Sequence, residues 1–144
     1  MINTMGPLMD SWDSLLSSEL SVPVSKEDAQ EDVGNTYVVI RAESETGANN
    51  KHSFADTAII IVDIVSRFKN NVNRQIVENI DSEINAALFN GPYDHNLPAQ
   101  SGMQILNVFR ENTQYINEDN GSVRYYRKIS RYSHRLHQTG EAES

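Results

Sequence analysis

Two long β-patterned segments, joined by a tight turn signal, constrain the fold more than any other feature of this sequence. The first segment, residues 103–117, reads MQILNVFRENTQYIN, and the second, residues 123–138, reads VRYYRKISRYSHRLHQ. Between them, Asn120 and Gly121 form the dipeptide that is most typical of a two-residue hairpin turn. We therefore expect a long C-terminal β-hairpin.

This hairpin is long for a domain built from 144 residues. Extended residues 104–117 reach ~46 Å at ~3.3 Å each, whereas a compact domain of this size is ~38 Å across. The hairpin therefore bends at a bulge, or its tip projects from the body. The apolar residues of the second strand change sides partway, which favours a bulge. Those on one side are Val123, Tyr125 and Ile129, and those on the other are Tyr126, Tyr132 and Leu136.

The second strand of the hairpin also concentrates positive charge. Residues 122–138 contain five cations and no carboxylate, although the whole chain has a formal charge of −8. Residues 1–121 hold 18 acids and 7 bases, so the rest of the chain is strongly acidic. Charge segregation of this kind indicates a binding partner more than a catalytic site. The five cations are Arg124, Arg127, Lys128, Arg131 and Arg135.

Three interpretations of this basic strand remain open. Tyrosines between the arginines suit nucleic-acid stacking and phosphate contact, although the acidic remainder of the chain would repel phosphate. A solvated edge strand would use the cations to prevent edge pairing. The favoured interpretation is a subunit interface, in which the basic strand of one copy meets the acidic surface of the next and closes a ring. Its expected residues are Arg124, Tyr126, Arg127, Lys128, Arg131, Tyr132 and Arg135.

Two further strands are predicted before the hairpin. Residues 21–36 are polar and acidic with Pro23 and Gly34, which predicts a loop. Residues 36–44, TYVVIRAES, are β-branched and aromatic, which predicts a strand. Residues 52–68 form a second strand whose middle is apolar on both sides, so we expect a central strand that is covered on both faces.

Two amphipathic helices are predicted from apolar residues at helical spacing. Residues 8–20 repeat Leu8, Trp12, Leu15 and Leu16 on one helical face. Residues 73–89 form the second helix, which ends before a loop at residues 92–102. Its predicted inner face holds Ile76, Ile80, Ile84, Ala87 and Leu88, and its predicted outer face holds Arg74, Glu78, Asp81 and Glu83.

The element order α-β-β-α-β-β predicts an α+β fold with a mostly antiparallel four-stranded sheet and helices packed on it. We expect one domain over residues 1–138 and a disordered tail over residues 139–144. The absence of cysteine excludes disulfides, zinc–thiolate sites and a cysteine nucleophile. The longest apolar run, residues 58–62, is too short to span a bilayer, so no membrane partner is expected.

No specific catalytic constellation is visible. The chain has no glycine-rich phosphate loop, no GxSxG and no HExxH. His134 and His137 would point to opposite faces of a strand, so we expect solvated or hydrogen-bonded imidazoles and no metal site. Asp56 and Asp63 are expected to face solvent or an interface, and the dipeptide Asp94–His95 is expected in a solvated loop. We therefore predict that the protein is not an enzyme and holds no cofactor.

The succession of these motifs resembles the tail terminator, or tail completion, proteins of tailed bacteriophages. In that family a short N-terminal helix precedes an extended PYVVI-like strand, an alternating apolar strand, a helix that ends in an I..AL pattern, and a final hairpin. Here NTYVVIRAES, SFADTAIIIVDIVSRF, NVNRQIVENIDSEINAAL and YYRKISRYSHRLHQ occupy these places. The resemblance extends over roughly residues 8–138.

The resemblance implies a structural virion protein at the head–tail junction, assembled in the host cytoplasm. Family members form a homo-oligomeric ring, usually of six subunits, and related ring adaptors of short-tailed phages can be twelve-fold. Expected partners are neck, portal-adaptor and tail proteins, with the genome passing through the lumen without specific binding. An acidic lumen suits this passage because it repels DNA phosphate. The alternative is a small nucleic-acid-binding protein that uses the basic Arg/Tyr strand.

Overall fold

The computed structural model describes residues 5–27, 35–47, 55–68, 74–91, 94–98, 103–119 and 123–138. The predicted turn at residues 120–122 and the predicted tail at residues 139–144 lie outside them. The elements are α1 (Met5–Glu19), β1 (Val24–Lys26), β2 (Thr36–Gly47), β3 (Ala55–Phe68), α2 (Arg74–Leu88), β4 (Phe89–Gly91), β5 (Asp94–His95), β6 (Met103–Asp119) and β7 (Arg124–Gln138).

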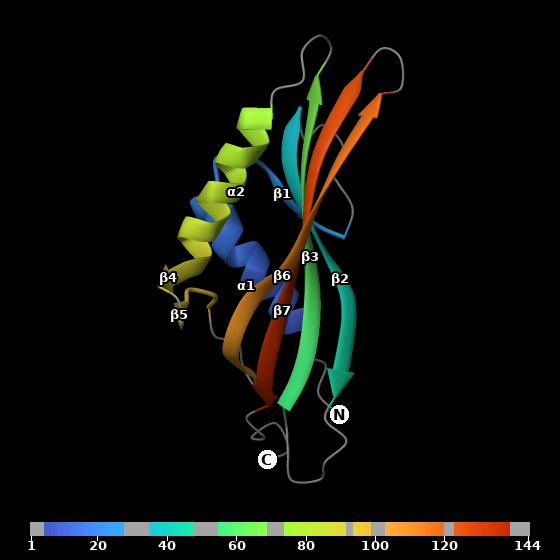
Figure 1. Cartoon of the computed structure of the whole chain (residues 1–144). Helices are drawn as coiled ribbons and strands as arrows, with labels where there is room; N and C mark the ends of the chain where they lie inside the picture. The colour runs from blue at the N-terminus through green and yellow to red at the C-terminus, as the bar shows by residue number, and fades with distance from the viewer. Residues whose placement is uncertain are drawn as a thin grey trace.

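Within these residues, a long twisted five-stranded sheet forms the body, and α1 and α2 pack on one of its faces (Figure 1). The strand order is β1-β2-β3-β7-β6. Neighbouring strands are antiparallel except for β1 and β2, which are parallel. The predicted α+β class, with helices packed on a mostly antiparallel sheet, is confirmed.

The sheet has one strand more than the four that the sequence predicts. Strand β1 lies inside the predicted loop, and its three residues pair with Val38, Val39 and Ile40 of β2. A strand of three residues is too short to show an alternating pattern, so periodicity could not reveal it. A small second sheet, β4 with β5, likewise occupies the end of the predicted helix and part of the predicted loop at 92–102.

The hairpin contains bulges, as predicted, but they lie in β6 and not in β7. The register of β6 against β7 shifts between Ile105 and Asn107 and again between Arg110 and Asn112. By contrast, β7 pairs with β3 without interruption. The predicted change of buried face along β7 is therefore wrong. One side of β7 is buried along its whole length, through Tyr126, Lys128, Ser130, Tyr132, His134 and Leu136.

Helix α1 buries the face that its spacing predicts, although it begins three residues earlier than expected. Leu8, Trp12 and Leu16 are fully buried in the core. Pro7 lies in the first turn, where its missing N–H breaks no intrahelical hydrogen bond. Trp12 is the largest of the fully buried side chains, so α1 is anchored mainly through this residue.

Helix α2 is rotated relative to the prediction. Ile80, Ile84 and Leu88 are buried as expected, but Ile76 is 37% exposed and Val77 takes its place in the core. Asp81, which was expected on the outer face, is buried against the sheet. The reason is that Arg110 of β6 and Lys128 of β7 form ion pairs with the Asp81 carboxylate from the sheet side of α2.

The two helices cover only one face of β3, so the prediction of cover on both faces is wrong. We call the other side of the sheet the open face, because no described element packs on it (Figure 1). Central side chains of the open face are Tyr37, Val39 and Arg41 on β2, Ile61, Asp63 and Val65 on β3, Tyr125, Arg127, Ile129 and Arg131 on β7, and Phe109, Gln114 and Glu118 on β6.

No described helix is long and apolar enough to span a bilayer.

Candidate functional site: the charged open face

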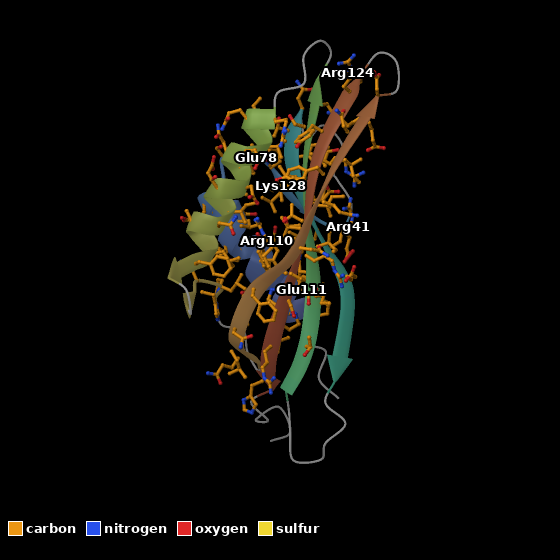
Figure 2. The ribbon with its side chains drawn as sticks, in the orientation of Figure 1. Arg41, Glu78, Arg110, Glu111, Arg124 and Lys128 are labelled. Atoms are coloured by element: carbon orange, nitrogen blue, oxygen red, sulfur yellow. The ribbon has the colours of Figure 1, made fainter. Side chains whose placement is uncertain are left out.

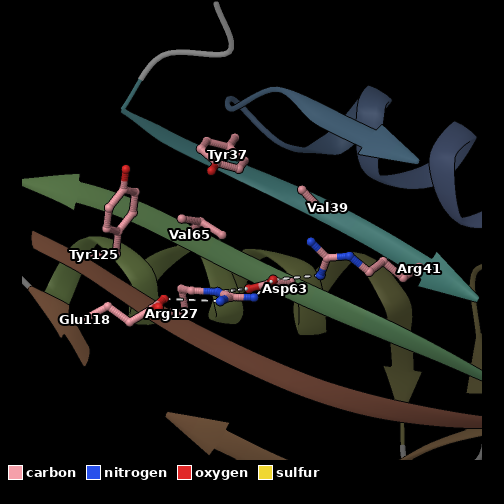
Figure 3. Close-up of a pocket in the computed structure, with 8 residues that line it drawn as sticks. All are labelled: Tyr37, Val39, Arg41, Asp63, Val65, Glu118, Tyr125 and Arg127. Carbon is pink, nitrogen blue, oxygen red and sulfur yellow. Dashed lines mark hydrogen bonds and ion pairs between the residues drawn. The ribbon is translucent and has the colours of Figure 1, made fainter. Parts of the chain in front are cut away.

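A pocket of about 310 Å³ lies on the open face (Figure 3). Side chains from four neighbouring strands, β2, β3, β7 and β6, line it, so the pocket extends across the sheet. Two tyrosines and a group of charged side chains surround two valines. The lining residues are Tyr37, Val39, Arg41, Asp63, Val65, Glu118, Tyr125 and Arg127.

Asp63 is the centre of this pocket, and its side chain is fully buried. Arg41 donates from Nη1 to Asp63 Oδ2 at 2.7 Å. Arg127 donates from Nη2 to the same oxygen at 2.5 Å and from Nε to Oδ1 at 3.3 Å. The prediction that Asp63 faces solvent or an interface is therefore wrong for the isolated chain, because two guanidinium groups cover it. The side chain of Asp56 lies outside the described residues.

Arg127 extends this network to the edge of the sheet. Its Nη1 donates to Glu118 Oε1 at 3.2 Å, so alternating charges run across four strands from Arg41 to Glu118. The hydrogen bond to Asp63 raises the pKa of Arg127 above its ordinary value. Charge-assisted hydrogen bonds of this kind hold the strands in one register more firmly than neutral ones do.

A second set of ion pairs crosses the open face beside the pocket. Arg131 Nη2 lies 2.5 Å from Glu43 Oε2 and 3.8 Å from Glu111 Oε1. Arg131 Nε is buried and has no hydrogen-bond partner among the described residues. Acids of β2, β3 and β6 thus largely neutralise the arginines of β7 within one subunit.

The other side of β7 meets α2 through a buried polar cluster (Figure 2). Lys128, which is 5% exposed, lies 2.7 Å from Glu78 Oε1 and 2.8 Å from Asp81 Oδ2 through its Nζ. Burial would lower the pKa of Lys128, but its hydrogen bonds to Asp81 and Glu78 outweigh burial and raise it. Arg110 completes the cluster by donating to Asp81 Oδ1 at 2.5 Å and to the hydroxyl of Tyr132 at 2.8 Å.

The structure divides the residues of the predicted interface between the two faces of the sheet. Strand alternation alone would have shown this, because residues of odd and even number point to opposite sides. Tyr126, Lys128 and Tyr132 are buried on the helix side. Arg127 and Arg131 lie on the open face in ion pairs. Arg124 pairs with Asp119 at 3.3 Å near the hairpin turn, and Arg135 is exposed.

The histidines singled out in the sequence serve as hydrogen-bonding groups. His134 is fully buried between Trp12 Nε1 at 2.7 Å and the Ala58 carbonyl oxygen at 3.0 Å. His95 contacts the Ile105 carbonyl oxygen through Nε2 at 2.9 Å, so it is held against β6 instead of lying in a solvated loop. Among the described residues, no group of three or more His, Cys, Asp or Glu side chains could hold a metal ion.

No protein-family model matches the sequence, and no curated protein matches it either. Among solved structures, a chain of the "Virion of native gene transfer agent (GTA) particle" is similar, with a TM-score of 0.68 and 12% sequence identity. The similarity covers 94% of this chain and 99% of that chain. The two chains therefore share a fold over almost their whole length.

Proposed function

We propose that the protein is a structural subunit of a phage-like virion and forms a homo-oligomeric ring at the head–tail junction. The observation that carries the proposal is the fold likeness to a chain of a gene transfer agent virion, which covers 99% of that chain. The succession of sequence motifs, which resembles tail terminator proteins, supports the same position. A ring of six subunits is the expected assembly, and a ring of twelve is the alternative.

The chemistry of the pocket supports a structural role more than a catalytic one. A general acid or base needs a carboxyl group within hydrogen-bond reach of the substrate. Asp63 is instead fully buried and accepts hydrogen bonds from Arg41 and Arg127, so its carboxylate is engaged within the sheet. The open face is thus built to hold four strands together, as a subunit that transmits load within a particle requires.

The charge of the subunit suits a channel for nucleic acid. The formal charge is −8, and ion pairs occupy most of the cations of β7. A ring of such subunits would present a negative lumen, which would repel phosphate and let the genome slide. Neck, portal-adaptor and tail proteins are the proposed partners on the two sides of the ring.

The arrangement of β7 does not favour the alternative of a nucleic-acid-binding surface. Stacking on bases requires exposed aromatic rings close to free cations. Tyr126 and Tyr132 are buried beneath α2, on the opposite side of the sheet from Arg127 and Arg131. Of the three tyrosines on β7, only Tyr125 shares the open face with these arginines, and both arginines there are held in ion pairs with acids, so they are not free cations.

Native mass spectrometry and negative-stain electron microscopy of the purified protein test the proposal. We expect a closed ring with a discrete number of subunits, alone or with tail tubes added as the binding partner. A protein that stays monomeric at high concentration, and that also fails to form a ring on tail tubes, would refute the assignment. Binding to DNA that weakens steeply with salt would support the alternative instead.

A further inference from the structure

Near one end of the hairpin, strands β6 and β7 carry exposed apolar side chains and an exposed arginine. Phe109 is 52% exposed and Leu106 is 44% exposed, both on the edge strand β6. Arg135 is exposed on the neighbouring strand β7. We call Leu106, Phe109 and Arg135 the Phe–Arg patch. Aromatic and arginine side chains together are the residues that most often dominate binding energy at protein interfaces.

The strand register brings two members of this patch together on the open face. Phe109 pairs with Ser133, and Arg135 pairs with Asn107. Phe109 and Arg135 are thus diagonal neighbours on one side of the sheet, within reach of each other's side chains. Arg135 also differs from the other cations of β7, because no ion pair links it to an acid within the described part of the chain.

A complementary surface lies on the other side of the molecule. Helix α1 carries three acids and no base, and of these acids Asp10 and Glu19 are exposed and Asp13 is half-buried. Asp10 pairs with Lys26, but no ion pair joins Asp13 or Glu19 to a cation among the residues described. Glu19 ends the helix, where the partial negative charge of the helix dipole disfavours an acid. A cation supplied by another molecule would therefore stabilise the acids of this surface electrostatically.

We propose that the Phe–Arg patch of one copy docks on the C-terminal half of α1 of a second copy, with Arg135 near Asp13 and Glu19. The inference rests on the proposed function, because it names the contact that repeats around the ring. Helix α1 packs on the covered face of the sheet (Figure 1), whereas Phe109 and Arg135 lie on the open face. One subunit cannot join its own two surfaces, so the contact is head-to-tail, and it forms a ring when the rotation between neighbouring subunits closes.

Charge reversal with reciprocal rescue tests the pairing by analytical ultracentrifugation. We expect Arg135→Glu, and separately Asp13→Arg with Glu19→Arg, to raise the apparent dissociation constant of the ring roughly tenfold or more. Combining all three changes in one chain should restore assembly, because the charges are then exchanged. Glu83→Lys is the matched control, since it reverses an exposed acid on α2 and should leave assembly unchanged.

Cross-linking locates the contact without relying on charge. The natural chain has no cysteine, so single cysteines report on one position each. We expect an equimolar mixture of Ser14→Cys and Asn107→Cys chains, treated with a short bismaleimide, to give mixed dimers joining the two variants. Dimers of like chains alone would refute a head-to-tail contact between α1 and β6.

The results separate this inference from the proposed function. If the natural chain forms rings that the Arg135→Glu change and the α1 changes do not weaken, the contact is refuted and the ring proposal stands. If the natural chain never assembles, both are refuted. Weakened rings with charge-swap rescue and mixed cross-links support both. Circular dichroism of each variant shows that lost assembly does not come from unfolding.

Discussion

Trp12 donates a hydrogen bond from its indole Nε1 to Nε2 of His134 at 2.7 Å, across 122 residues of sequence. Since His134 Nε2 accepts, Nδ1 carries the proton and donates to the Ala58 carbonyl oxygen at 3.0 Å. This arrangement requires the neutral imidazole, because a charged ring has no acceptor. One buried histidine thus joins α1, β3 and β7.

Acid should weaken the fold through this histidine. Burial lowers the pKa of His134 from its ordinary value of 6.5 to about 4. Between these two values the unfolded chain binds a proton that the folded chain does not, so the free energy of unfolding decreases as the pH falls through this window. The loss amounts to about 3 kcal/mol. Urea denaturation at about pH 7, 5 and 3.5, which lie above, within and below this window, measures the loss.

Replacement of His134 measures how much this residue contributes to the pH dependence of the free energy of unfolding. His134→Gln can keep one donor and one acceptor, so it should fold with reduced stability at pH 7 but lose less stability than the natural chain on acidification. His137→Gln, at a half-buried position near the end of β7, is the control and should retain the natural pH dependence. Equal pH dependence in His134→Gln and the natural chain would contradict this prediction.

Removal of the charge on Asp63 should destabilise the open face. Asp63→Asn leaves Arg41 and Arg127 side by side without the carboxylate between them, and we expect a loss of about 2–3 kcal/mol in the free energy of unfolding. Glu118→Gln is the matched control, because the Glu118 side chain is 53% exposed and its ion pair should contribute less than about 1 kcal/mol. Chemical denaturation curves of equal midpoint for both variants would rule out the central role of Asp63.

The buried ion pair between Lys128 and Asp81 should show strong energetic coupling between its two side chains. In a double-mutant cycle with Lys128→Met and Asp81→Asn, we expect a coupling energy of about 2 kcal/mol, because both groups are buried and in contact. The same cycle on Arg124 and Asp119, whose side chains are half exposed, should give less than about 1 kcal/mol. A similar coupling energy for the two pairs would show that burial does not strengthen the Lys128 pair.

The sequence predicts the parts of this fold that bury long apolar faces. The face of α1 that contains Trp12 and the apolar middle of β3 have periodicities that extend over many residues, so they are found with nearly correct bounds. The three residues of β1 are paired by backbone hydrogen bonds to β2, which leave no periodic signal in the side chains.

The charged site was less predictable, because its partners are distant in sequence. The sequence predicts that Asp63 faces solvent or an interface and that Asp81 lies on the outer face of its helix, since acids are rarely buried without a partner. Their burial depends on cations that come from other strands, Arg41 and Arg127 for the first and Arg110 and Lys128 for the second. The strand register and the packing of α2 on the sheet determine which of these charged side chains form ion pairs. The splitting of β7 into two faces, by contrast, follows from simple alternation and was available from the sequence.

The position of β7 in the sheet has a consequence for how the protein is made. It is the last of the described strands along the chain, yet it lies between β3 and β6 and pairs with both along its length. A nascent chain that has not yet emerged from the ribosome through β7 would expose the edge of β3 without a neighbour. Formation of the sheet therefore requires that residues up to Gln138 have emerged, and it depends on non-local pairing, which is slow. Truncated products should remain unfolded, so only complete subunits would be available to enter a particle.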